Sequence, residues 1–297
     1  MLGFDVSNEL LHSPEQLRAR AAQDGYLFFK GLVDAAQLMQ LRSEVTGLMA
    51  DAGWLAAATQ PIDAIAAPDT AQIEGQAEYM RVYNQLQRLE NFHTFAHQPA
   101  ILSMLEALFG ETPLVHARNI ARMVYPQAVE HTTPAHQDYL YIEGTENTWT
   151  AWIPLGDCPI EQGNLAILPG THKQGMYPVH KSLGAGGHRI DTEALENQFE
   201  WRASDFEAGD VVLFHSLTIH RALPNLTQDR IRLSLDYRYQ PLSEPVVEGS
   251  LLPHYGQQTW EQIYANWKSE EFQYYWQKHA LNIVNNRAEL REKLVVK

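Results

Sequence analysis

The chain has 297 residues, 45% of them hydrophobic, and its 22 basic against 36 acidic side chains give a formal net charge of −14 at pH 7. This acidic balance argues against a nucleic-acid-binding protein, because phosphate contacts require clustered lysine and arginine. No apolar run is long enough to predict a membrane-spanning helix, and no signal-peptide pattern opens the chain. Cys158 is the only cysteine, which excludes an internal disulfide and a thiolate zinc site. We therefore expect a soluble cytoplasmic protein that binds neither nucleic acid nor membrane.

Extended and helical patterns follow one another along the chain. A short strand is predicted over residues 26–29, and a helix over 35–49, with Asp34 as N-cap and apolar residues at a period of 3.6. A second helix is predicted over 99–109, between Pro99 and Gly110. Short β-like runs broken by Gly and Pro follow, at residues 114–125, 148–155, 164–168, 210–215 and 230–239. Helical spacing returns over residues 260–294.

These patterns predict one domain over residues 1–297, mainly β with flanking helices. We expect a helical N-terminal part over about residues 1–112, a β core over about 113–240 and a helical tail over about 258–297. Residues 55–80 show little periodicity, which is typical of an irregular surface loop and also of a mobile lid over a site.

The triplet His136-Gln137-Asp138 is the first candidate for chemistry. On an extended segment residues i and i+2 face the same side, so His136 and Asp138 can present an imidazole and a carboxylate to one metal ion. His220, which follows a predicted buried strand, is the best third ligand. Two histidines and one carboxylate leave coordination positions open on iron(II), as oxygen activation requires.

Arginine is the second candidate for chemistry. Arg230 and Arg232 alternate with apolar residues on the strand after His220, so both are expected on its polar face. A planar guanidinium binds a carboxylate through two parallel hydrogen bonds, and Arg230 is favoured for this role.

Together these motifs resemble the phytanoyl-CoA dioxygenase family, a branch of the iron(II)/2-oxoglutarate-dependent oxygenases. The residues that carry the resemblance are His136-Gln137-Asp138, Trp152 to Asp157, Gly163 to His172, Gly209 to Ser216, His220, Asn225 and Arg230. The resemblance implies a double-stranded β-helix (a jelly-roll or cupin-like core), iron(II) held by His136, Asp138 and His220, and 2-oxoglutarate bound by Arg230. It also implies a dioxygenase that hydroxylates or oxidatively dealkylates a small organic metabolite with O₂, releasing succinate and CO₂.

The resemblance extends to residues around the metal. Trp152 and Asn119 match positions at which relatives contact 2-oxoglutarate, although Trp152 could equally belong to the sheet core. Tyr139 and Tyr141 follow the metal motif, and Tyr83 follows the possible lid, so all three are candidate substrate contacts or core residues. No catalytic residue is expected beyond the metal ligands.

Two alternatives remain open at the level of sequence: a cupin-like metal-dependent isomerase or epimerase, and a non-catalytic metabolite-binding barrel. The acidic composition and the aromatic candidates favour a small polar or cationic substrate. The sequence predicts neither the identity of the substrate nor the oligomeric state.

Overall fold

The computed structural model describes residues 1–127, 129–285 and 294–295. Its centre is a six-stranded antiparallel sheet in the order β1-β8-β4-β10-β2, with β3 also paired to β10. The strands of this sheet are β1 (Tyr26–Phe29), β2 (Pro113–Val115), β3 (Ile120–Val124), β4 (Trp149–Pro154), β8 (Val211–His215) and β10 (Arg232–Pro241). The predicted run over 114–125 is thus two strands, both laid against β10.

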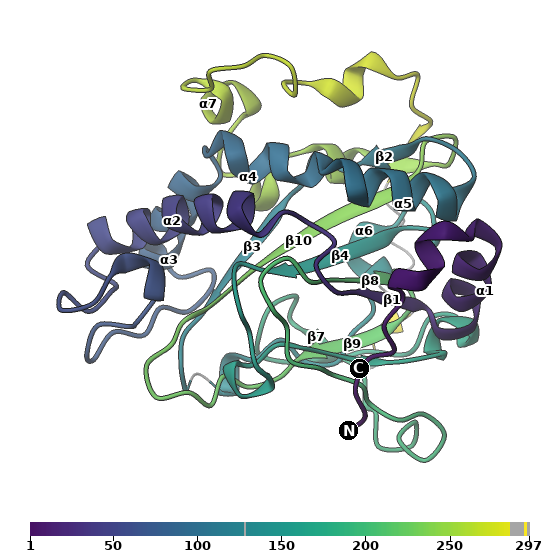
Figure 1. Ribbon diagram of the computed structural model, residues 1–297, viewed down its shortest axis with the longest axis horizontal. Helices are drawn as coiled ribbons and strands as arrows, with labels where there is room; N and C mark the ends of the chain where they lie inside the picture. Colours follow the sequence, from purple (N-terminus) through teal and green to yellow (C-terminus); the bar gives the residue numbers. More distant parts are fainter. Residues whose placement is uncertain (128, 286–293, 296–297) are drawn as a thin grey trace.

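A second, smaller sheet lies on the other side of the first (Figure 1). It consists of β5 (Leu165–Leu168) and β9 (Ile219–Ala222), which pair antiparallel with Ile167 opposite His220. The chain at His136 joins it through a bridge to His220. The two sheets form the double-stranded β-helix core that the family resemblance implied, and the space between them holds the polar residues described below.

Helices cover the outer face of the six-stranded sheet (Figure 1). They are α2 (Ala35–Asp51), α3 (Ala77–Leu86), α4 (Glu90–Thr94) and α5 (Pro99–Phe109), and α1 (Pro14–Asp24) lies beside β1. On β10 the residues Leu233, Leu235 and Tyr237 face these helices and join the main apolar core. The alternate residues of β10 therefore face the second sheet, because side chains of a strand point to opposite faces in turn.

Two helix predictions are confirmed with their caps. Helix α2 begins after Asp34, whose carboxylate accepts a hydrogen bond of 2.8 Å from the Gln37 amide. Helix α5 begins at Pro99 and ends before Gly110, which takes a left-handed conformation with φ of 78°. Local chemistry at the ends of these helices was sufficient to predict both boundaries.

The prediction of a helical tail is wrong for most of the described part. Helix α7 covers only Trp260–Tyr264, and β12 (Ile283–Val284) pairs in parallel with β11 (Val246–Val247). The aromatic residues Trp260 and Trp276 pack in a small separate core, so their spacing reflects packing between turns and not one helix face. Residues 286–293 and 296–297 of the predicted tail lie outside the described residues.

The remaining elements are short. They comprise α6 (Tyr139–Ile142), the hairpin strands β6 (His180–Lys181) and β7 (His188–Arg189), and 3-10 helices at Asn8–His12, Pro61–Asp63, Phe95–His97, Val129–His131, Ile160–Gln162, Thr171–Gln174, Glu248–Leu251, His254–Gly256 and Tyr275–Lys278. Within the described ranges, every helix is too short or too polar to span a bilayer.

The irregular segment 55–80 is anchored to the core. Ala64 is fully buried, and Ile65 forms a bridge to Arg230 at the start of β10. Further along, Glu74 lines a cavity next to the candidate metal ligands. The segment therefore connects α2 to α3 and also contributes to the wall of the cavity next to these ligands.

Candidate metal centre and its cavities

Three side chains converge between the two sheets. His136 and His220 lie opposite each other on a two-residue bridge, with backbone hydrogen bonds of 3.0 and 3.1 Å in both directions. Asp138 follows two residues later, in the turn that begins α6. One ligand atom from each residue lies within 4.8 Å of the other two, and all three residues are buried. The sequence predicted this set, and the fold brings its members together.

The two imidazoles are oriented for metal binding. Nδ1 of His136 lies 2.8 Å from the Pro134 carbonyl oxygen, and Nδ1 of His220 lies 2.9 Å from that of Thr218. Because a carbonyl only accepts hydrogen bonds, each Nδ1 carries the proton and each Nε2 presents a lone pair. Burial lowers the pKa of His220 to about 3, which keeps its ring neutral and able to coordinate.

The carboxylate is held by two neighbours. The Thr150 hydroxyl donates to Oδ2 of Asp138 at 2.6 Å, and the Arg238 guanidinium lies 3.4 Å from both carboxylate oxygens. Oδ1 is 3.6 Å from Nε2 of His136 and 3.8 Å from Nε2 of His220. Burial alone would raise the pKa of Asp138, but Arg238 and the two imidazoles bring it well below its ordinary value. Asp138 is therefore charged, with Oδ1 turned toward the two imidazoles.

A narrow pocket, here called the inner pocket, lies between the sheets next to this triad. Its walls include Arg232, Trp152 and Phe214. The Arg232 guanidinium lies 5.8 Å from the centre of the Trp152 ring, and its Nη1 donates to the Ser234 hydroxyl at 2.7 Å. Among the described residues Arg232 makes no ion pair, and its buried Nε has no hydrogen-bond partner. A buried cation with an unused donor fits a carboxylate ligand.

Two sequence-predicted residues do not lie in the inner pocket. Arg230 is exposed and precedes β10, where it bridges to Ile65, so of the two arginines predicted for this strand face it is Arg232 that lines the pocket. Asn119 is buried on the helix side, and its amide lies 3.2 Å from Nδ1 of His93. Both expectations assumed that the residue lies within a strand. Arg230 instead precedes β10 and Asn119 precedes β3.

A second space, the side cavity, has a volume of about 310 Å³ and meets the inner pocket at His136 and Asp138. Of the three predicted tyrosines, Tyr141 lines this cavity, with its ring 6.0 Å from that of His136. Tyr83 is buried behind the wall, where its hydroxyl lies 2.7 Å from Nδ1 of His254. Tyr139 is buried at the start of α6, and its ring does not line either space.

Several residues of the site were not singled out in the sequence, among them Thr150, Arg122 and Arg238. Arg122 on β3 pairs with Glu74 and lies 3.3 Å from Asp236. Arg238 belongs to the same alternating series as Arg232, so the period of two along this strand could have identified it. Thr150 carries no comparable signal.

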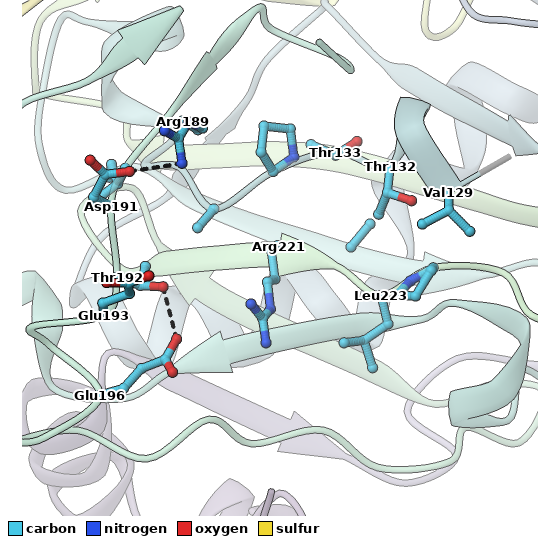
Figure 2. A pocket seen from close by; sticks show the side chains of 15 residues that line it. Val129, Thr132, Thr133, Arg189, Asp191, Thr192, Glu193, Glu196, Arg221 and Leu223 are labelled. Atoms are coloured by element: carbon cyan, nitrogen blue, oxygen red, sulfur yellow. Dashed lines mark hydrogen bonds and ion pairs between the residues drawn. The ribbon is translucent and has the colours of Figure 1, made fainter. Parts of the chain in front are cut away.

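A larger cavity of about 790 Å³, the back groove, lies on the other face of β9. Figure 2 shows Arg221 pointing from β9 into the groove, between Glu196 and Leu223. The Arg221 guanidinium lies 4.1 Å from the centre of the Trp201 ring. Size alone does not make this groove the active site, because none of the predicted site residues lines it.

A two-histidine, one-carboxylate triad next to a buried arginine, inside a double-stranded β-helix, defines the class of non-haem iron(II)/2-oxoglutarate-dependent oxygenases. The model of the phytanoyl-CoA dioxygenase (PhyH) family matches residues 21–234, and the chain belongs to this family. It is an oxygenase whose cofactor and co-substrate are iron(II) and 2-oxoglutarate.

Curated relatives match most of the chain, and a solved structure shares its fold. The chain is 30% identical over 251 residues to a 1-deoxypentalenic acid 11-beta-hydroxylase of Streptomyces arenae, covering 79% of this chain and 83% of the relative. It is 24% identical over 220 residues to the peroxisomal phytanoyl-CoA dioxygenase of Homo sapiens, covering 69% and 62% of the two chains. The fold matches that of the epimerase SnoN in complex with Fe³⁺, alpha ketoglutarate and nogalamycin RO, with a TM-score of 0.55 and 21% identity over 79% and 86% of the two chains.

Proposed function

We propose that this enzyme hydroxylates a C–H bond of a small organic molecule that enters the side cavity. The observation that carries the proposal is that two spaces meet at the candidate metal ligands: the inner pocket with its buried Arg232 and the side cavity are both lined by His136 and Asp138. The Streptomyces relative that is 30% identical is named as a hydroxylase, which supports hydroxylation over dealkylation.

In this proposal His136, Asp138 and His220 hold the iron, and Arg232 binds the distal carboxylate of 2-oxoglutarate over Trp152. Bound iron(II) with 2-oxoglutarate and O₂ supplies the oxidising power, with succinate and CO₂ as the co-products. The protein positions the metal ligands and the co-substrate. Thr150 and the carbonyls behind the two imidazoles keep the ligand atoms directed at one point.

The test is an anaerobic titration of metal-free protein with iron(II) and then 2-oxoglutarate, monitored by the weak visible charge-transfer band. We expect the band in the native protein and in Asp51→Ala, a matched control at an exposed acidic residue. Asp138→Ala should abolish it. Iron binding without any band in the native protein would refute the proposal and favour a metal-dependent isomerase.

The reaction type is tested by isotope labelling. Once a substrate is found by succinate release, hydroxylation under ¹⁸O₂ should place one ¹⁸O atom in the product. An isomerised product without ¹⁸O would show that this enzyme isomerises its substrate and does not hydroxylate it, which would refute the proposed hydroxylation.

A further inference from the structure

The side cavity is bounded on one side by two segments that belong to neither sheet. Glu74 comes from the segment between α2 and α3, Tyr255 comes from the segment after β11, and both line the cavity. The Tyr255 hydroxyl donates a hydrogen bond of 2.6 Å to the Glu74 carboxylate, which also forms an ion pair with Arg122 on β3. One carboxylate therefore joins both segments to the sheet at the cavity wall.

Residues 71–75, here called the flap, are attached to the rest of the protein mainly through Glu74. None of the five residues is buried. Apart from a turn with Gln76, every hydrogen bond and ion pair that they make within the described ranges goes through the Glu74 side chain. The chain is anchored on both sides, by a backbone hydrogen bond of Ala67 and by the buried Tyr79 on α3. The flap is thus a short stretch between two fixed points, held to the site by one side chain.

Two left-handed backbone conformations lie next to this contact. Gly75 has φ of 88°, and no atom beyond its chain neighbours lies within 4 Å of the position of a Cβ, so the residue after Glu74 can change conformation without a clash. Tyr255 has φ of 64°, in a region that costs free energy for a residue with a Cβ. Its hydrogen bond to Glu74 helps to hold this conformation, so breaking the contact also relieves strain.

Arg122 keeps a charge partner when Glu74 moves away. Its Nε lies 3.3 Å from Oδ2 of Asp236, a residue of β10 that lines the inner pocket. Removing one partner from a buried charge is strongly unfavourable when the charge is left unpaired. Because Asp236 remains in place, the Glu74 contact can break without leaving an unpaired guanidinium in the wall.

We propose that the flap is a gate through which the substrate enters the side cavity, and that Glu74 holds this gate closed. In the closed state Glu74 contacts Arg122 and Tyr255. In the open state the flap turns outward about Gly75, and Arg122 remains paired with Asp236. The gate rests on the proposed function, which assigns the side cavity to the substrate.

Other parts of the wall are less suited to opening. The turn at His136 and Asp138 carries metal ligands, so its displacement would dismantle the metal site. The tip of the β6–β7 hairpin also lines the cavity, but it is packed there: a Cβ on Gly186 would lie 2.6 Å from the Tyr141 hydroxyl oxygen. Unlike these two parts of the wall, the flap can move without the loss of a metal ligand or of tight packing.

The test measures access to the side cavity with a cysteine thiol. Ser250 lines this cavity and is 5% exposed, so Ser250→Cys places a thiol inside it. Cys158, the only cysteine of the chain, is buried and does not line the cavity, so its thiol reports general opening of the protein. Labelling of each thiol by methyl methanethiosulfonate is followed over time by peptide mass spectrometry, in the full-length protein with and without iron(II).

We expect the introduced thiol to be labelled slowly while Glu74 is present. Adding Glu74→Gln, which keeps the shape of the side chain and removes its charge, should accelerate this labelling at least about 10-fold, corresponding to 1.4 kcal/mol, and leave the labelling of Cys158 unchanged. Tyr255→Phe removes only the hydroxyl and should give a smaller acceleration of about 2- to 5-fold, the effect of one hydrogen bond. Glu78→Gln is the matched control, because Glu78 is exposed on α3 and pairs with Arg81 of the same helix.

A second measurement follows the flap itself. Thermolysin cleaves on the amino side of large apolar residues such as Ile73, and cleavage requires the chain to leave the protein surface. We expect cleavage before Ile73 to be faster in Glu74→Gln and in Tyr255→Phe than in the native protein. The thermal midpoint of each variant identifies any that is destabilised as a whole.

The possible results separate the gate from its alternatives. Labelling of the introduced thiol that does not respond to Glu74→Gln overturns the inference and places the entrance elsewhere in the wall, for example at the β6–β7 tip. Equal acceleration at Cys158 also overturns it, because Glu74 would then stabilise the whole fold. Neither result bears on the proposed function, which the charge-transfer titration tests separately. Accelerated labelling in a protein that shows no charge-transfer band would overturn the proposed function and keep the gate.

Discussion

Replacing Arg232 with glutamine is the sharpest perturbation of the inner pocket. Arg232 is 3% exposed and makes no ion pair among the described residues, so a bound carboxylate would be its charge partner. Losing one partner of a buried, hydrogen-bonded charge pair costs about 2–5 kcal/mol. The dissociation constant of 2-oxoglutarate should therefore rise by about 30-fold to several thousand-fold, at about 1.4 kcal/mol for each factor of ten.

Arg230→Gln is the matched control, two residues away on the same segment. Because Arg230 is exposed, its loss should change stability and 2-oxoglutarate binding by less than about 0.5 kcal/mol, a factor of about two. The assay is the anaerobic charge-transfer titration, which yields the dissociation constant of 2-oxoglutarate directly. If Arg230→Gln abolished binding while Arg232→Gln retained it, the assignment from burial would be refuted.

Stability without ligand provides an independent measurement. Arg232 is a buried cation that has no carboxylate partner within residues 1–127, 129–285 and 294–295, so glutamine should leave the melting temperature unchanged or raise it. Native protein at 100 times the dissociation constant of 2-oxoglutarate should gain about 2.7 kcal/mol, and the variant should gain less than about 1 kcal/mol at the same concentration. A variant that melts much lower without ligand would show that the arginine is structural.

Three further predictions concern the frame of the site. Thr150→Val removes the hydroxyl that orients the metal-binding carboxylate, and iron affinity measured by competition with a chelator should fall about 10- to 100-fold. Burial lowers the pKa of His93 to about 4, so below pH 6.5 the unfolded chain takes up a proton at this residue that the folded chain does not. His93 should therefore contribute about 2–3 kcal/mol to the stability lost between pH 7 and pH 4.5, and urea unfolding of His93→Gln should show a pH-dependent loss that is smaller by about this amount. Gly163→Ala adds a Cβ 2.6 Å from a backbone oxygen at φ of 78° and should cost at least about 2 kcal/mol, whereas Gly175→Ala, at φ of 74° in open space, should cost about 1–2 kcal/mol from strain alone.

Short-range chemistry explains what the sequence predicted well. Helix α2 depends on the Asp34 cap, and helix α5 on Pro99 and Gly110, all of which act within one or two turns. The metal motif was also local for two of its three members. His220 is favoured as the third ligand because it follows a predicted buried strand, and the bridge to His136 shows how the fold brings the two histidines together.

The errors arise where distant segments decide the outcome. Arg230 and Arg232 have the same parity along the chain, so alternation cannot separate them. The segment at Ile65 covers the chain at Arg230 and leaves it outside the pocket, and Arg232 is the first residue of β10, opposite Val124 on β3. The prediction for Asn119 is wrong for a similar reason, because its side-chain amide contacts His93 in the helix layer and does not face the inner pocket.

Strand β10 shows how stability and chemistry share one element. Its odd-numbered residues, such as Leu235 and Tyr237, are buried against the helices and stabilise the fold. Its even-numbered residues face the second sheet, where Arg232 and Arg238 lie beside the inner pocket and the metal ligand. A shift of one residue in the pairing of β10 would exchange the two faces, burying the charges in the apolar core and removing them from the site. The apolar face therefore maintains the register on which the placement of every polar group along this strand depends.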